Sequence, residues 1–225
     1  MDDSAARRGV IRNCLGVGVA VGAYGAAFGA ASVAAGLSVL QTSLLSLLAF
    51  TGGTQFAVVG VLAGGGTMLA ALSSGLLLGS RNALYAMRLA PLLRVRGARR
   101  LLAALGTIDE STAMAVGQRT DELSRTAFWW TFGAVFSFWN LATLAGAAGA
   151  STLGDPKNIG LDAVIPAAFL ALLAPRLRAG RIERRVGAAG AAIAFVLVPL
   201  TAPGIPVLAA SAALLLATSL RRRTA

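Results

Sequence analysis

The chain has 225 residues, of which 56% are apolar and only 13% are charged, about half of the roughly 25% found in soluble domains. Its 20 Lys and Arg outnumber 9 Asp and Glu, there is no histidine, and Cys14 is the single cysteine. These counts exclude Ser-His-Asp catalysis, histidine-ligated metals and an internal disulfide, and we expect neither a metal nor a cofactor.

The distribution of charge indicates an all-α polytopic integral membrane protein. Residues 13–80 contain no Asp, Glu, Lys or Arg, and at ~1.5 Å per helical residue this stretch could cross a ~30 Å hydrocarbon core more than three times. The arginines lie mainly between apolar blocks, which is typical of cytoplasmic loops and argues against nucleic-acid binding. We predict about seven transmembrane segments, at Cys14–Ala35, Leu37–Ala63, Thr67–Ala90, Ala127–Ala150, Ile159–Pro175, Val186–Ala202 and Ile205–Leu220.

The first segment carries glycines on one helical face. Gly18, Gly22, Gly25 and Gly29 recur at i, i+4, i+7 and i+11. Such a smooth face lets another backbone approach closely. We therefore expect it to pack on another helix, in this chain or in a partner.

The second segment contains Gly52-Gly53-Thr54-Gln55 near its middle. Adjacent glycines weaken a helix by roughly 1 kcal/mol each relative to alanine. We predict a broken helix, whose second half offers free N–H groups to a substrate carboxylate, with Thr54 and Gln55 as neighbours. The alternative is a continuous helix whose glycines permit close packing.

The third segment places Arg81, Tyr85 and Arg88 on one helical face, with Asn82 beside them. Arg81 lies ~15 Å from the cytoplasmic end, too deep to reach water easily, and a buried guanidinium needs a partner. Arg81 can form a purely structural ion pair or bind a ligand, and the sequence leaves both roles open. The candidate partners are Asp109, Glu110, Asp162 and a substrate carboxylate.

The central loop, residues 91–126, is rich in arginine and is predicted to be cytoplasmic. Its apolar stretch Leu101–Ile108 precedes Asp109 and Glu110, which predicts a half-helix packed against the bundle with both acids facing inward. The alternative is an amphipathic helix on the membrane surface.

Asp162 stands near the start of the short fifth segment, four residues before Pro166. It is either a helix cap at the outer interface or a carboxylate that couples transport to protons. Sequence alone leaves both open.

Loop arginines place the C-terminus in the cytoplasm. Seven spans then put the N-terminus outside, whereas a re-entrant second segment would leave six. We predict a single domain, 1–225. Within it, weak similarity at an offset of 124 residues suggests two repeat halves, 12–90 and 127–203. This offset aligns Thr51-Gly52 with Pro175-Arg176. Chance similarity between Ala- and Leu-rich helices is the alternative.

Four stretches together resemble the AzlC family, the large subunits of two-component branched-chain amino acid exporters. They are Gly52–Phe56, Arg81–Ala86, Ile108–Glu110 and Gly160–Phe169. Asn82 stands where the family has histidine, Ile108 replaces a threonine and Ala86 a glycine, so the substrate preference can differ from the family's Leu, Ile, Val and Met.

The resemblance implies a proton-motive-force-driven secondary exporter of branched-chain amino acids in the cytoplasmic membrane, working with a small AzlD-type membrane subunit. Whether the protein also forms a homo-oligomer is left open by the sequence. The alternatives are a non-autonomous structural or chaperone-like subunit and a passive channel for small apolar solutes, and an enzyme is disfavoured because catalytic groups are scarce. The expected substrate-binding residues are Gly52, Gly53, Thr54, Gln55, Arg81, Asn82 and Tyr85. The expected coupling residues are Asp109, Glu110 and Asp162.

Overall fold

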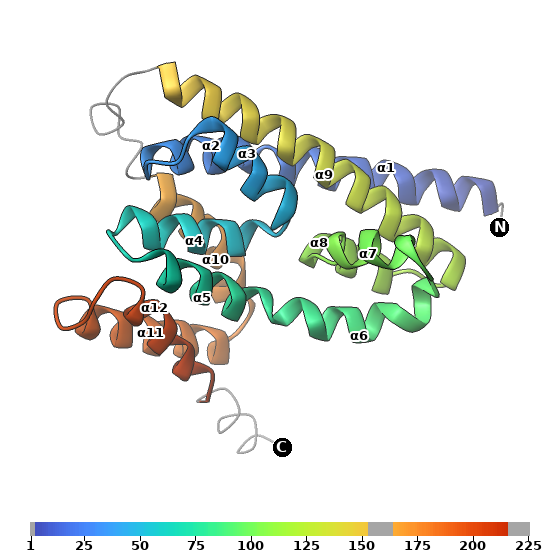
Figure 1. Ribbon diagram of the computed structural model, residues 1–225. Coiled ribbons are helices and arrows are strands. Elements are labelled where there is room, and N and C mark those ends of the chain that lie inside the picture. Colours follow the sequence, from blue (N-terminus) through green and yellow to red (C-terminus); the bar gives the residue numbers. More distant parts are fainter. Residues whose placement is uncertain (1–2, 153–163, 216–225) are drawn as a thin grey trace.

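The structure is a computed structural model that describes residues 3–152 and 164–215, and these residues form helices and turns without strands (Figure 1). The predicted all-α class is therefore confirmed. Two continuous helical stretches, Ser4–Ala34 and Asp121–Thr152, are long and apolar enough to cross a membrane by length and composition.

The framework of the fold is a parallel pair of long helical stretches. Helices α1 (Asp3–Gly22) and α2 (Tyr24–Ala34) pack along α9 (Asp121–Thr152), as Figure 1 shows. The predicted glycine face lies in this contact: Gly18 meets Ala134, and Gly25 lies against the backbone carbonyl of Trp139. The face therefore packs on a helix of this chain, and its surface is already covered.

The second predicted segment is broken into two short helices. Helix α3 (Val39–Leu48) begins at a capping box between Ser38 and Gln41. It ends at Ala49, the backbone of Thr51 is extended, and α4 (Gly52–Ala63) begins at the glycine pair. The chain reverses between α3 and α4 (Figure 1). The predicted break is confirmed, and because the chain reverses there, the segment does not run straight on as one helix.

Helices α5 (Met68–Gly79) and α6 (Arg81–Leu93) carry the third predicted segment. Ser80 joins them in helical geometry, so they form one long, slightly interrupted stretch. Helix α5 packs against α4, and α6 runs on toward the N-terminal end of α9, which it contacts (Figure 1).

A second hairpin approaches from the other end of α9. Helices α7 (Ala98–Leu105) and α8 (Asp109–Val116) meet at a short turn, where Gly106 lies against the ring of Phe132. Ile108 belongs to the same buried cluster as Phe50, at the tip of the first hairpin. The inward half-helix predicted for the central loop is therefore confirmed, and the two tips meet midway along α9.

The C-terminal part contains α10 (Val164–Ala179), α11 (Arg181–Leu197), α12 (Ile205–Ala210) and the 3-10 turn Ser211–Ala213. The fifth predicted segment ended at Pro175, but α10 continues through Pro175 to Ala179, and the extended backbone of Gly180 separates it from α11. A helix can lose the one hydrogen bond that proline removes and still continue. Asp162 lies outside the described residues.

We predict that Gly29→Val lowers the melting temperature of the purified protein by about 4–8 °C, corresponding to ~2 kcal/mol of overpacking. A Cβ at Gly29 would collide with the backbone of Thr143 and Ala147. Gly16→Val is the matched control, because a Cβ there meets nothing within 4 Å. Equal melting temperatures for the two variants, by differential scanning fluorimetry in detergent, would contradict the close α2–α9 contact.

Candidate functional site

The two hairpin tips enclose a cavity of about 570 Å³, within the range of small-molecule pockets. Its wall is formed by α1, α2, α4, α5, α6, α8, α9 and α10 with the α3–α4 turn. The apolar lining residues are Val21, Phe50, Phe56, Leu78, Ile108, Val135, Trp139, Leu173 and Pro175. The polar lining comes from Tyr24, Thr51, Gly52, Gly53, Arg81, Asp109, Glu110 and Arg176.

Two helix N-termini line this cavity. Helix α4 begins there at Gly52, and no side chain caps its first turn. The first backbone N–H groups of a helix have no partner within the helix, and they carry its positive dipole end. Helix α8 also begins there, but its first turn contains Asp109 and Glu110. The α4 end therefore attracts an anion, whereas the α8 end is negatively charged.

Arg81 and Tyr85 both hold Asp109. An Arg81 guanidinium nitrogen lies 2.8 Å from Oδ2 of Asp109, and the Tyr85 hydroxyl donates a 2.6 Å hydrogen bond to Oδ1. Of the candidate partners for Arg81 that the structure describes, Asp109 and Glu110, it is Asp109 that forms the ion pair. Each side chain of the ion pair is 33% exposed, so the pair lies at the cavity surface and is not sealed in a core.

Glu110 lines the same cavity and is half-buried. Among the described residues it has no ion-pair partner, in contrast to Asp109, both of whose oxygens are engaged. Its carboxyl is therefore the acidic group that remains available to a ligand or a proton.

Three of the residues expected to bind substrate lie behind the cavity wall. Gln55 is fully buried and donates through Nε2 to the carbonyl oxygen of Ser46 at 3.2 Å, which ties α4 to α3. Thr54 is buried against the glycines of α5, and Asn82 does not line the cavity. Gly52, Gly53 and Arg81 do line it, and Tyr85 reaches it through Asp109.

The aromatic wall was not identified from the sequence. Trp139 is 4% exposed, stacks on Phe28 at a centroid distance of 6.1 Å and meets Phe56 edge-on at 6.4 Å. The signal was present, since Phe132, Phe136 and Trp139 occupy one face of α9 at i, i+4 and i+7.

Arg176 also escaped the sequence analysis as a cavity residue. It was interpreted only as one of the arginines that mark a loop, but the structure places it on α10, in the cavity wall. Arg81 and Arg176 thus give the cavity two basic side chains, and Asp109 and Glu110 give it two acidic ones.

Comparison with known proteins identifies the family. The sequence profile described as AzlC protein matches residues 16–153, more than half of the chain. The chain belongs to the AzlC family. The matched range includes both hairpin tips and Arg81, but not Asp162.

Two relatives support a membrane location. The chain is 31% identical over 180 residues to an uncharacterized membrane protein of Archaeoglobus fulgidus, covering 79% of each sequence. It is 28% identical over 155 residues to the inner membrane protein YgaZ of Escherichia coli, covering 65% of this chain and 63% of that protein. No solved structure matches the chain. Both relatives are described as membrane proteins, and the two helical stretches of spanning length in this chain agree with the membrane location that its composition predicts.

We predict a measurable coupling energy between Arg81 and Asp109. Arg81→Gln and Asp109→Asn should each lower the free energy of unfolding, because each single variant leaves one charge unpaired. The double variant should lose about 1 kcal/mol less free energy of unfolding than the two single losses added together. The partial exposure of the pair keeps this figure modest. Thermal unfolding of the three variants measures the cycle.

The pair Arg94 and Asp121 is the matched control. Its closest atoms are 3.7 Å apart and its side chains are 71% and 53% exposed, so its cycle should give a coupling near zero. Equal coupling energies in the two cycles would contradict the special position of Asp109.

Proposed function

We propose that this AzlC-family protein is a secondary active exporter of branched-chain amino acids, namely Leu, Ile and Val, with Met as a further candidate. One observation carries the proposal: a single cavity combines an uncapped helix N-terminus, an available carboxyl group and an apolar aromatic wall. These three features match the three parts of an apolar zwitterion.

The substrate carboxylate would lie at the N-terminus of α4. The N–H groups of Gly52 and Gly53 are free of intrahelical partners, and the absence of side chains leaves the backbone open to approach. Arg81 lies next to this turn, since a Cβ on Gly53 would come within 3.3 Å of its guanidinium. The carboxylate thus meets backbone donors with a basic group nearby.

The substrate ammonium group would lie near Glu110. Asp109 already accepts from Arg81 and Tyr85, so Glu110 is the acid that can receive a new cation. The same carboxyl can take up and release the coupling proton, a role typical of intramembrane acids. Asp162 remains a second candidate for that role.

The substrate side chain would lie against Phe50, Phe56, Trp139 and Ile108. Burying a Val, Leu or Ile side chain contributes roughly 1.5–3 kcal/mol. A wall made mainly of rings and branched aliphatic groups favours branched-chain over polar amino acids, because a polar side chain buried against it would lose hydrogen bonds to water.

The exporter is proposed to work in the cytoplasmic membrane, with its C-terminus inside and with a small AzlD-type subunit. The glycine face of α1 and α2 is not its docking surface, because α9 covers it. Helix α11 has no fully buried residue along its length and leaves surface for such a partner. A non-autonomous subunit and a passive channel are the competing functions.

We expect proteoliposomes that contain the protein and its small subunit to show leucine counterflow. Internal unlabelled leucine should drive transient uptake of labelled leucine, and valine or isoleucine should block it. Flux without counterflow would favour a channel. The same assay is run on proteoliposomes that contain this chain without the small subunit. If the folded chain is active only together with the small subunit, the pair is the transporter. No counterflow in either preparation would contradict the proposed substrate.

We predict that Glu110→Gln separates exchange from proton coupling. Net leucine flux driven by a pH gradient should fall at least ~10-fold, because the amide cannot carry the proton. Leucine–leucine exchange should keep its maximal rate within about 3-fold at saturating leucine, with a raised KM, because the amide keeps the shape but no longer pairs with the substrate ammonium group. Glu122→Gln, an exposed acid in the first turn of α9, is the control. Unchanged gradient dependence in Glu110→Gln would remove this residue from coupling and leave Asp162→Asn as the next variant.

A further inference from the structure

A second cavity lies far from the first, where the end of α6 and helix α7 meet the beginning of α9. This basic pocket has a volume of about 680 Å³ and is rimmed by Arg94, Arg96, Arg99 and Arg125. Its apolar lining includes Leu93 and Trp129. The proposed transport function makes no use of it.

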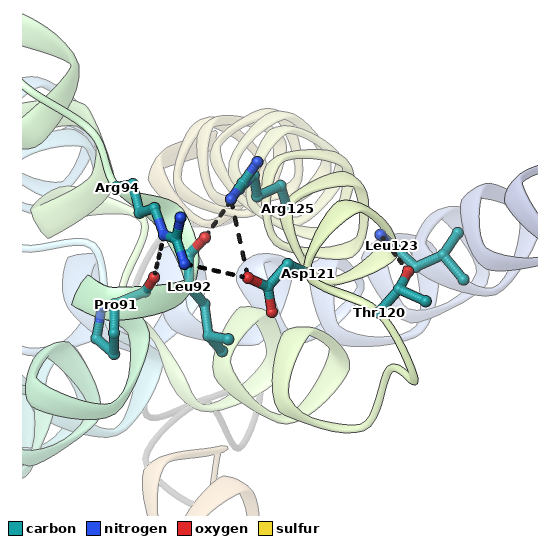
Figure 2. Close-up of polar contacts among 7 residues, drawn as sticks. All are labelled: Pro91, Leu92, Arg94, Thr120, Asp121, Leu123 and Arg125. Atoms are coloured by element: carbon teal, nitrogen blue, oxygen red, sulfur yellow. Dashed lines mark hydrogen bonds and ion pairs between the residues drawn. The ribbon is translucent and has the colours of Figure 1, made fainter.

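Two of the arginines are held in place by the protein itself. Figure 2 shows Arg125 donating through Nε to the carbonyl oxygen of Leu92 at 2.8 Å, and Arg94 donating to that of Pro91 at 3.1 Å. Asp121 lies between them, 3.7 Å from Arg94 and 4.0 Å from Arg125. The two hydrogen bonds to main-chain carbonyl oxygens orient both guanidinium groups at the rim, and the longer, exposed contacts with Asp121 add little.

The other two arginines are uncompensated. Arg96 and Arg99 are exposed and form no ion pair or hydrogen bond with the described residues. Four arginines and no acidic residue line the pocket, and Asp121 pairs only with Arg94 and Arg125, so the pocket is strongly positive. Guanidinium groups bind phosphate in a two-pronged geometry, which makes a phosphate the matching anion.

The apolar side of the pocket identifies the source of that phosphate. Leu93 and Trp129 belong to a buried cluster with Leu89 and Phe128, and Trp130 beside them is 44% exposed. Tryptophan next to arginine at the end of a long apolar helix is typical of the membrane interface. A phospholipid would place its phosphate among the arginines and its chains along this apolar side, whereas a soluble phosphate would leave that side empty.

We propose that the basic pocket binds the phosphate group of an anionic phospholipid. Basic pockets between membrane helices are known to recognise such headgroups, and each arginine near the surface strengthens binding about 5-fold. The ligand sits at one end of α9, and the transport cavity lies around the middle of that helix.

The test is native mass spectrometry of the purified protein in a neutral detergent, titrated with phosphatidylglycerol. We expect saturable binding of the lipid, and we expect the double variant Arg96→Gln, Arg99→Gln to bind about 30-fold more weakly. The control Arg184→Gln, Arg185→Gln removes the same charge from α11, away from the pocket, and should bind as the unaltered protein does.

Two further probes separate the alternatives. Phosphatidylcholine should bind weakly and equally to all variants, and glycerol 3-phosphate, which lacks acyl chains, should not displace phosphatidylglycerol at equal concentration. Competition by glycerol 3-phosphate or inorganic phosphate would assign the pocket to a soluble anion and overturn the proposal. Two other results would also overturn it. One is an equal loss of lipid binding in both double variants. The other is a dimer of the unaltered protein that forms without lipid and is dissociated only by the Arg96→Gln, Arg99→Gln substitutions.

Discussion

The break between α3 and α4 is the constraint on which the rest of the structure depends. A helix that ends among apolar side chains leaves N–H and C=O groups that lipid cannot satisfy, so it must be enclosed by protein or water. Here α9, the α7–α8 turn and Arg81 surround the N-terminus of α4. The cavity follows directly, because the free N–H groups of Gly52 and Gly53 require a polar space in front of them.

Close packing of α1 and α2 on α9 stabilises the enclosure of the α4 N-terminus. The glycines of the first segment bring the backbones into contact, and this places Trp139 against both Phe28 and the beginning of α4. A Cβ at Gly52 would lie only 2.8 Å from the Trp139 ring. The glycine pair thus serves two purposes, since it opens the backbone to a ligand on one side and accepts the indole ring on the other.

The sequence was sufficient where one residue type carries a strong local preference. Adjacent glycines predicted the break, two acids after an apolar run predicted the inward half-helix, and a deep arginine predicted an ionic partner. The sequence was insufficient where packing between distant segments determines the path of the chain. Whether the chain reverses after Phe50 depends on contacts with α9, and the cavity position of Arg176 depends on how α10 lies.

The charges of the two cavities explain why they suit different ligands. In the central cavity Arg81 and Arg176 face Asp109 and Glu110, so its basic and acidic groups balance. A zwitterion adds no net charge to such a site, and its two ends find opposite partners without leaving a charge unpaired in a poorly solvated space. The basic pocket has no such balance, because four arginines line it and Asp121 pairs with only two of them, Arg94 and Arg125. Such a surplus is tolerable only near water, and it calls for a ligand that carries a net negative charge. The end of α9 next to Trp129 and Trp130 is such a place.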